Sequence, residues 1–357
     1  MSVVSVPSIV EAPYIIAKIG GVEIGKFGKN EFPNYMNSIN ISKINGTLNT
    51  YTLNLSHQVQ AGEDPNYLDK IFSSVSNDRI IYLSYGDYSE PSTTFNEEKC
   101  IITGVSSQVD VASARINYTV KCISDAVALI NKSYSFGSTT AKGSDVLKDL
   151  LFNPSYGLQK VFTGMVNKNE VLARNDIVSD DKIVKIPAAK NVTLSSYMNT
   201  VTQYMQPIVP GPSKYILSIQ DNVEKFGGTI FKVVNTVSSP INSYTIDVGY
   251  PGDNMVMDFR LSNDMDWAMF YNSGDTWWSK MTEFPISGTL TIKGLVKPVM
   301  LVSKIKLNVY FYGKKHITSG EYIITAQNDT LDGNGYRTSL NLLRVGGDEW
   351  RIKLKYI

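Results

Sequence analysis

Apolar and polar residues alternate along the C-terminal part of the chain. Over residues 304–311 the odd positions are Ile, Leu, Val and Phe, and the even positions are Lys, Lys, Asn and Tyr. This period of two is typical of a strand with one buried face. Similar alternation occurs over 289–293, 322–326 and 338–342, and Asp332-Gly333-Asn334-Gly335 separates the last two segments. Gly and Asn adopt the positive φ of tight hairpin turns, so about 285–346 is predicted to be a run of antiparallel strands.

The N-terminal third has the same pattern. Predicted strands cover 14–19, 22–24, 38–43, 50–59 and 79–85, followed by a strand pair over 100–122. Gly20-Gly21 predicts the turn within the first strand pair, and Asn45-Gly46 predicts the turn within the second. One short helix is predicted over 66–75, where apolar residues recur at helical spacing.

The middle of the chain is different. A helical turn is predicted over 124–130, and a helix over 142–151 is predicted to begin at Ser144 as its N-cap and to end before Pro154. A second helix is predicted over 194–205, before Pro207, and a strand pair over 215–219 and 229–234. Residues 155–190 are predicted to be loop and short strands.

This order predicts a mainly β (α+β) fold: two related β-barrel domains with a small helical α+β insert between them. We expect the first β-barrel domain over residues 1–123, the insert over 124–240, and the second β-barrel domain with a C-terminal tail over 241–357. A distant duplication of the β-rich block would explain the order, although residue identity does not demonstrate it.

Composition narrows the function. The 357 residues exceed a typical single domain of about 100–200 residues. Lys and Arg number 34 against 33 Asp and Glu, which leaves a net charge of +1 and argues against a free nucleic-acid binder. Only 19% of residues are charged, while Tyr numbers 21. A subunit covered by several neighbours would show such a surface, and so would a protein from a compositionally biased genome.

The N-terminus has neither a basic region nor a long apolar core, so it does not resemble a signal peptide, and no stretch is apolar enough to predict a membrane span. We therefore expect folding in a cytoplasm. Two cysteines and two histidines provide no clustered ligand set, so we expect no metal. A hairpin centred on residue 111 would bring Cys100 opposite Cys122, and we expect two reduced, buried thiols there.

Several motifs resemble sites without meeting their chemistry. The segment from Gly20 to Lys26 has the glycine and lysine spacing of a phosphate-binding loop. However, Phe27 stands where such a loop requires Ser or Thr, and no helix is predicted to follow. We interpret the motif as a hairpin turn. Asp329, Asp332 and Asn334 faintly resemble a calcium loop but are followed by Tyr and Arg, so a solvated turn is predicted.

Histidines and acids give no clear catalytic group. Ser56 and His57 are adjacent on a predicted strand, so their side chains point to opposite faces. His316 is predicted to lie in a loop, and we expect both histidines to be structural. The acidic pairs, which we interpret as solvated loops, are Glu97-Glu98, Asp180-Asp181 and Asp348-Glu349. We therefore predict no catalytic, cofactor-binding or metal-binding residue.

One cluster of aromatic residues leaves an alternative function open. It comprises Trp267, Phe270, Tyr271, Trp277 and Trp278. Aromatic residues are enriched in cores and obligate interfaces, which we favour here. The alternative is a carbohydrate-binding or hydrolytic tail-tip protein that stacks sugars on these rings.

The C-terminal block carries a family resemblance. Residues 320–325 read Gly-Glu-Tyr-Ile-Ile-Thr, Asp329-Thr-Leu-Asp332 follows, and 335–345 read Gly-Tyr-Arg-Thr-Ser-Leu-Asn-Leu-Leu-Arg-Val. This segment, with the strands from Phe284 onward, resembles the end of the second barrel in baseplate or tail hub proteins of tailed phages and related contractile injection systems, the late-control D-like hubs. Upstream, the similarity lies in the order of blocks.

The resemblance implies a structural, non-enzymatic hub of a virion tail or baseplate, assembled in the cytoplasm of the bacterial host. Two tube-like barrels per chain in a homotrimer would form a pseudo-sixfold ring that joins the hexameric tail tube to the central spike or tail tip. Other baseplate proteins and the tape-measure protein are further implied partners. DNA would pass through the ring without sequence-specific binding, and no stable membrane insertion or cofactor is implied. Relatives with a fused hydrolase or spike extend beyond the hub, so we expect such a part to be a separate protein here.

Overall fold

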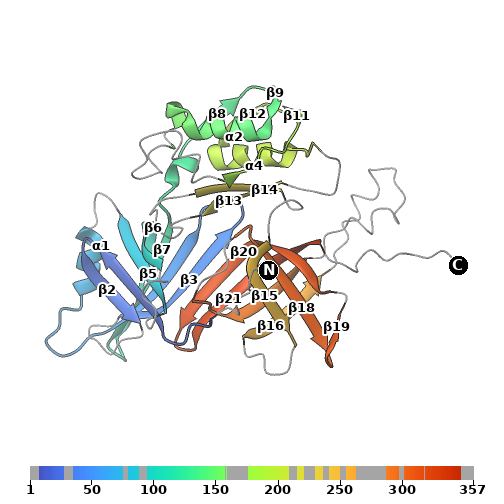
Figure 1. Ribbon diagram of the computed structural model, residues 1–357. Helices are drawn as coiled ribbons and strands as arrows, with labels where there is room; N and C mark the ends of the chain where they lie inside the picture. Colours follow the sequence, from blue (N-terminus) through green and yellow to red (C-terminus); the bar gives the residue numbers. More distant parts are fainter. Residues whose placement is uncertain are drawn as a thin grey trace.

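The structure is a computed structural model that describes residues 8–27, 35–74, 79–87, 95–156, 158, 176–208, 215–220, 230–235, 241–249, 255–262, 287–296, 301–316 and 318–346. The mainly β fold with a small helical insert is confirmed. Both β-rich blocks contribute to one 14-stranded sheet, and the helices α2 (Gly143–Phe152) and α4 (Leu194–Tyr204) lie above it in Figure 1.

The strands of the N-terminal block follow the predicted alternation closely. They are β1 (Pro13–Ile19), β2 (Val22–Phe27), β3 (Met36–Ile44), β4 (Thr50–Gln58), β5 (Ile80–Asp87), β6 (Phe95–Asp110) and β7 (Arg115–Ser124). The predicted helix is α1 (Tyr67–Ser74). It covers β7, because the rings of Phe72 and Tyr118 lie 5.7 Å apart and the Tyr118 hydroxyl donates to Asp69 at 3.0 Å.

The C-terminal block contains the predicted antiparallel run and two strands before it. Its strands are β15 (Ile241–Val248), β16 (Val256–Ser262), β17 (Ser287–Lys293), β18 (Lys304–Phe311), β19 (Lys314–Lys315), β20 (Gly320–Asp332) and β21 (Gly335–Gly346). Sequence patterns missed β16 because a bulge between Val256 and Asp258 interrupts its alternation. They also missed β15, which pairs with β18 in parallel.

The two blocks repeat one topology. Strands β3, β4, β7 and β6 lie side by side in that order, and β16, β17, β21 and β20 repeat the order. Bulges occur at equivalent places, between Met36 and Ser38 and between Val256 and Asp258. Each long hairpin is also shifted at the same point, between residues 102 and 104 on β6 and between residues 324 and 326 on β20. The strand registers thus show a structural repeat that residue identity does not show.

The junction between the blocks is a strand pair. In antiparallel register, β20 runs from Ala326 opposite Ile44 to Leu331 opposite Ile39 on β3. The sheet therefore continues through the junction without an edge (Figure 1). Among the described residues, three buried apolar clusters accompany it, one mainly in each β-rich block and one in the insert.

In the described part of the insert, two helices pack over short strand pairs. The strands are β8 (Ser133–Phe136), β9 (Thr139–Lys142), β10 (Asp176–Ile177), β11 (Ile183–Ile186), β12 (Ala189–Thr193), β13 (Tyr215–Gln220) and β14 (Ile230–Asn235), with 3-10 turns at Val127–Leu129 and Pro154–Tyr156. Helix α4 is capped by Thr193, whose hydroxyl accepts from the Ser196 backbone N–H at 3.3 Å. The insert also contacts the β3–β4 turn, because the Asn199 amide donates to the Gly46 carbonyl at 2.9 Å.

The cap predicted for α2 is wrong. Ser144 lies inside the first turn, and the cap comes from a distant residue, Asp181. Its carboxylate accepts from the Ser144 backbone N–H at 3.1 Å and from the Ser144 hydroxyl at 2.6 Å. A carboxylate next to a helix N-terminus is stabilised by the unpaired N–H groups there.

A glycine next to the junction gives the first testable prediction. A Cβ at Gly294 would overlap the base of the Tyr336 side chain, which is buried in the N-terminal core cluster. Because Tyr336 cannot move without opening that core, Gly294→Ala is expected to lower the free energy of unfolding by about 1–3 kcal/mol in urea titrations. The matched control is Gly333→Ala, where a Cβ meets open space. Equal stability of both variants would contradict the packing described for Tyr336.

Candidate functional site

The sheet presents a polar face on the side opposite its apolar core. In β4 the residues Tyr51, Leu53, Leu55 and His57 are buried, whereas the alternate residues face the other side. Strand registers place the following side chains on this polar face: Ser38, Asn40, Ser42, Thr52, Asn54, Ser56, Ser106, Gln108, Asn117, Thr119, Thr289, Thr291, Asn328, Thr330, Ser339 and Asn341. Hydroxyls and amides therefore dominate across both blocks.

These side chains hydrogen-bond across neighbouring strands. Asn54 donates to the Ser38 hydroxyl at 3.0 Å and accepts from Thr119 at 3.3 Å. The Thr330 hydroxyl donates to Asn40 at 3.1 Å, which extends the network across the junction between β20 and β3. The polar face is thus a single hydrogen-bonded surface, and the hydroxyl and amide groups that form these bonds are uncharged.

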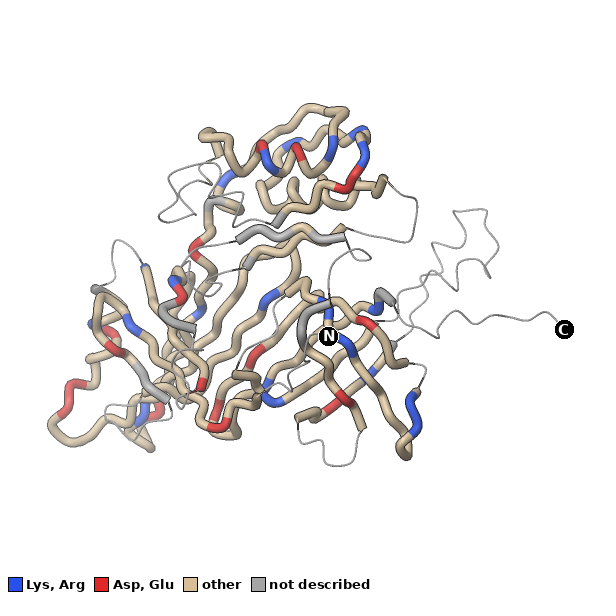
Figure 2. The backbone as a smooth tube through the Cα atoms, viewed as in Figure 1, with Lys and Arg blue, Asp and Glu red and all other residues tan. Residues whose placement is uncertain are grey.

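Charges on the polar face are few, with a small excess of basic residues. Among the described residues, the charged side chains of this face include the basic residues Arg115, Lys121, Arg260, Lys293 and Arg337 and the acidic residues Asp110, Asp258 and Asp332. Arg337 binds Asp332 at 2.5 Å, and Arg260 binds Asp258 at 2.7 Å. In Figure 2 most of the sheet is accordingly tan, with scattered blue and red positions. Such a surface attracts polyanions only weakly.

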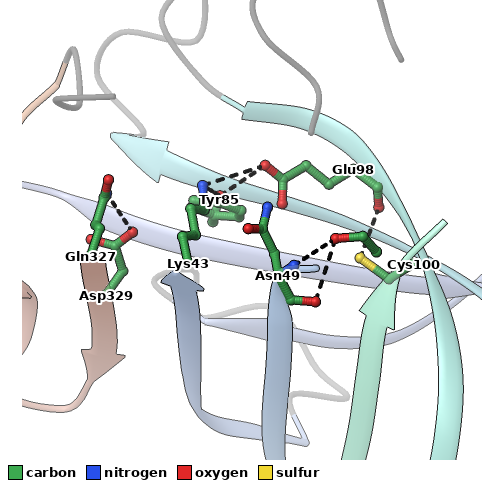
Figure 3. Close-up of polar contacts among 8 residues, drawn as sticks. Lys43, Asn49, Tyr85, Glu98, Cys100, Gln327 and Asp329 are labelled. Atoms are coloured by element: carbon green, nitrogen blue, oxygen red, sulfur yellow. Dashed lines mark hydrogen bonds and ion pairs between the residues drawn. The ribbon is translucent and has the colours of Figure 1, made fainter. Parts of the chain in front are cut away.

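On the opposite face, buried polar side chains meet beside the junction (Figure 3). Lys43 of β3 donates to the Tyr85 hydroxyl at 3.2 Å and lies 3.9 Å from Glu98 of β6. The Tyr85 hydroxyl donates to the Glu98 carboxylate at 3.0 Å, and Glu98 is fully buried. Burial is the main cause that raises the pKa of Tyr85 well above its ordinary value, and the negative charge of Glu98 raises it further. Lys43 thus neutralises a carboxylate that would otherwise be costly to bury.

The C-terminal block adds a second buried acid. Asp329 of β20 accepts hydrogen bonds from Gln327 at 2.8 Å and from Thr338 at 2.7 Å. Burial raises the pKa of Asp329, and the positive charge of Lys43 opposes this rise. Lys43 therefore acts on acids from both blocks, and we name Lys43, Tyr85, Glu98 and Asp329 the junction cluster.

The prediction that the acidic pairs lie in solvated loops is wrong for two residues. Glu98 belongs to the junction cluster, and Asp181 is fully buried as the cap of α2, so neither lies in a solvated loop. Asp180 accepts from the Tyr215 hydroxyl at 2.8 Å. In each case the partner comes from a distant strand or helix, which a polar local sequence does not reveal.

The histidines lie apart from each other. His57 is buried on β4 and Ser56 faces the other side, as predicted. The His57 ring lies edge-on to Tyr35 at 5.0 Å, with its Nε2 3.6 Å from Glu63. His316 is exposed after β19, and its Nδ1 lies 2.8 Å from the Thr318 hydroxyl.

The turns have the predicted form. Gly20 and Gly21 connect β1 to β2 with positive φ, and β2 takes the place of the helix that a phosphate loop needs. Asp332 accepts from the Asn334 backbone N–H at 2.8 Å within the β20–β21 turn. Asp329 is the exception to the predicted solvated turn, because it is buried in the junction cluster.

The cysteines are free and buried, but their predicted pairing is wrong. Cys100 lies opposite Ser124 and Cys122 opposite Ile102, because the turn spans four residues after Asp110 and a bulge between Ile102 and Gly104 shifts the register by one residue. Burial raises the pKa of the Cys122 thiol to about 12, which makes it a poor nucleophile at neutral pH.

Some candidates lie outside the described residues, namely Trp267, Phe270, Tyr271, Trp277, Trp278, Asp348 and Glu349, and the side chain of Glu97 is likewise not described. Within the described ranges no three His, Cys, Asp or Glu residues gather as a metal site would require. No helix in the same ranges is long and apolar enough to cross a membrane.

Comparison with known proteins identifies the fold. The sequence matches no protein-family model, and no curated protein is similar to it in sequence. The structure is similar to the c3393 protein of E. coli, with a TM-score of 0.53, 8% identity, and coverage of 93% of this chain and 77% of that one. That protein is described as a component of the type VI secretion system with structural similarity to the T4 bacteriophage tail proteins gp27 and gp5.

Two tail proteins share the fold over nearly their whole length. A tail protein from Neisseria meningitidis MC58 has a TM-score of 0.53 and 9% identity, and the match covers 93% of this chain and 97% of that one. The 43 kDa tail protein of prophage MuSo2 from Shewanella oneidensis has a TM-score of 0.52 and 11% identity, with 93% and 98% coverage. The predicted resemblance to phage tail and type VI secretion proteins is confirmed for the fold.

The junction cluster gives the second prediction. Lys43→Met leaves buried carboxylates without the cation between them, so we expect the free energy of unfolding to fall by about 3–5 kcal/mol in urea titrations. The matched control is Lys99→Met on β6, whose Nζ lies 3.1 Å from Asp125 at the surface, where a change of about 0–1 kcal/mol is expected. A loss at Lys43 no larger than at Lys99 would show that the cluster does not stabilise the junction.

Proposed function

We propose that the chain is a structural tail or baseplate hub, a trimeric symmetry adapter that joins the hexameric tail tube to the central spike or tail tip. The observation that carries this proposal is the repeated four-strand unit. Strands β3, β4, β7 and β6 form one unit, β16, β17, β21 and β20 form the other, and both lie in one continuous sheet. A chain with two equivalent units is suited to contact an assembly of higher symmetry than its own.

Two similar units per chain would allow a trimer to match a hexameric partner. Three copies with two units each present six similar surfaces around one axis, which match a hexameric ring on one side. A trimeric spike or tip needs only three equivalent contacts on the other side. Ring-forming contacts are heterologous and must close after a whole number of copies, so the two units need matched surfaces.

The polar face suits the wall of a channel. DNA and tape-measure protein must pass without being held, and a strongly positive wall would bind phosphates and release counterions. The polar face instead carries hydrogen-bonded hydroxyls and amides such as Asn54, Thr119 and Thr330, with ion pairs neutralising Asp258 and Asp332. We place this face toward the lumen of the hub.

The role is non-enzymatic in this proposal. The tube protein, the spike or tip protein and other baseplate proteins are the partners, and the mature location is the virion tail after assembly in the cytoplasm of the bacterial host. The tail and secretion proteins that share the fold support this assignment.

Lysine substitutions on the polar face test whether this face lines the channel. Asn117 and Asn341 lie on this face of β7 and β21, and both are exposed. Particles that carry Asn117→Lys with Asn341→Lys are expected to assemble in normal numbers but to deliver DNA at least tenfold less efficiently, since each copy adds two positive charges to the wall. Assembly is counted by electron microscopy and delivery by transduced DNA per particle.

The matched control is Thr140→Lys, an exposed position of β9 in the insert. It should change neither assembly nor delivery. Normal delivery by the double variant, in particles shown to contain it, would contradict the assignment of the polar face to the channel.

A further inference from the structure

We propose that the β18–β19 hairpin is a docking element. Its tip, residues 311–316, would insert aromatic side chains into a pocket of another protein that has an apolar floor and an acidic rim. The tip reads Phe-Tyr-Gly-Lys-Lys-His, and all six residues are exposed. Neither the polar face nor the repeat of the two units takes part in this contact, which therefore goes beyond the proposed hub function.

The hairpin extends past the end of the apolar core. Along β18 the odd positions Ile305, Leu307 and Val309 are buried, and Phe311 continues the same series but is 58% exposed. In Figure 1 the hairpin lies at the lower right, on the side away from the insert. The fold thus leaves the ring of Phe311 in contact with water.

The turn at the tip holds a tyrosine in an unfavourable backbone conformation. Tyr312 and Gly313 have φ of 50° and 77°, and two successive positive values are typical of a two-residue type I′ turn. Asn and Gly are favoured at the first of these positions, whereas a bulky aromatic residue is strained there. The β1–β2 hairpin makes a similar turn with Gly20 and Gly21, at φ of 55° and 81°. Tyr312 therefore costs stability that glycine would not.

The side chain of Tyr312 contributes no contact that would offset this cost. It is 104% exposed, and it makes no hydrogen bond or ring contact with any residue that the structure describes. Backbone strain of this kind is concentrated at binding and catalytic sites. Tyrosine is also enriched among the residues that dominate protein interfaces, because its rigid ring buries a large area and its hydroxyl can still form a hydrogen bond. The geometry therefore indicates an anchor for a partner.

The base of the hairpin is held in place by hydrogen bonds. The His316 backbone N–H donates to the Val309 carbonyl at 2.7 Å, and the Val309 backbone N–H donates to the Ser319 hydroxyl at 2.9 Å. The ring of His316 lies edge-on to that of Phe311, with 5.0 Å between their centroids. Phe311 and Tyr312 are thus ordered before binding, which lowers the entropy lost on docking. A fixed geometry suits a shaped protein pocket, whereas a fluid lipid bilayer does not require one.

The N-terminal block uses the equivalent position differently. Strands β5 and β18 pair with β6 and β20 just before the corresponding bulges, and in these registers Asp87 corresponds to Phe311. Asp87 is buried and accepts from the Glu11 backbone N–H at 2.8 Å. An exposed aromatic residue is therefore not a requirement of the repeated topology, and Phe311 distinguishes the second block from the first.

The charge of the tip specifies the chemistry of the partner. Lys314 and Lys315 are exposed, and neither forms an ion pair with a described acidic residue. The strand register places Lys314 directly opposite Phe311, so the positive charges adjoin the aromatic rings. Two rings beside two adjacent positive charges fit a pocket with an apolar floor and Asp or Glu side chains at its rim. Charges of opposite sign at the edge of an interface speed and orient docking.

Site-specific cross-linking identifies the partner. Tyr312 is replaced by the photoreactive amino acid p-benzoylphenylalanine in the full-length chain, and the cells that produce it are illuminated. We expect one main protein adduct, which mass spectrometry should map to a segment that contains Asp or Glu. The control is the same replacement at Tyr204, which is 44% exposed at the end of α4 and should not form this adduct. No protein adduct at residue 312, an adduct with a segment that lacks acidic residues, or the same adducts at both positions would overturn the proposal.

The substitution Tyr312→Asn separates binding from folding. Asn tolerates the positive φ, so the melting temperature should rise by about 1–2 °C, whereas the Kd for the purified cross-linked protein should rise at least tenfold. Tyr204→Asn should leave this Kd unchanged. A lower melting temperature of Tyr312→Asn would show that Tyr312 supports the fold instead, and an unchanged Kd would contradict the docking role.

Charge reversal tests the acidic rim. Lys314→Glu with Lys315→Glu should weaken the same binding at least tenfold. The matched control is Lys182→Glu with Lys185→Glu, which reverses two exposed lysines of the insert and should have no effect. Equal binding by both double variants would contradict an acidic partner.

Two further measurements separate this inference from its alternatives. Vesicles of phosphatidylglycerol and phosphatidylethanolamine should not bind the chain, and vesicle binding that requires Tyr312, without a protein adduct, would favour a lipid surface and overturn the proposal. If the chain forms trimers that bind tube protein but residue 312 gives no protein adduct, this inference fails and the hub function stands. If the adduct forms as expected while the chain neither self-associates nor binds tube protein, the hub function fails and this inference stands.

Discussion

The pairing of β20 with β3 is the contact on which the rest of the structure depends. It joins two blocks that are separated along the chain by the whole insert, and it does so through backbone hydrogen bonds that leave no edge between them. The junction cluster reinforces the pairing, because Lys43 lies 3.9 Å from Glu98 of one block and its positive charge opposes the rise in the pKa of Asp329 of the other. Since a buried charge is tolerated only with its partner in place, the cluster favours one register over neighbouring ones.

The period of two along the strands gives the sheet its two different surfaces. Alternate residues build the apolar clusters, and the others build the polar face, whose side chains hydrogen-bond even across the junction. The same backbone can therefore carry the stability of the fold on one side and a weakly charged polar surface on the other. The repeat of the four-strand unit doubles this arrangement, with β6, which also pairs with β5, and β16 as the outer strands of the two units.

Local sequence predicted the strands well where alternation was uninterrupted, as in β4 and β18, and the helices where apolar spacing and Pro residues marked them. It failed where the cause was distant. Glu98 and Asp181 lie in polar segments, and their burial depends on Lys43 and Ser144 far along the chain. At the cysteines the β6–β7 register was missed by two residues, because the turn is longer than its sequence suggested and a bulge follows between Ile102 and Gly104. The junction could not be predicted, because nothing local links residue 43 to residue 327.

The family resemblance in the C-terminal strands indicated the fold, and the strand registers then gave what residue identity could not, the correspondence between the two blocks. Electron cryomicroscopy of the purified protein at micromolar concentration, with tube protein added, tests the hub assembly directly. We expect closed threefold rings in which six similar four-strand units alternate around the axis. A field of separate single chains without bound tube protein would contradict the hub assembly.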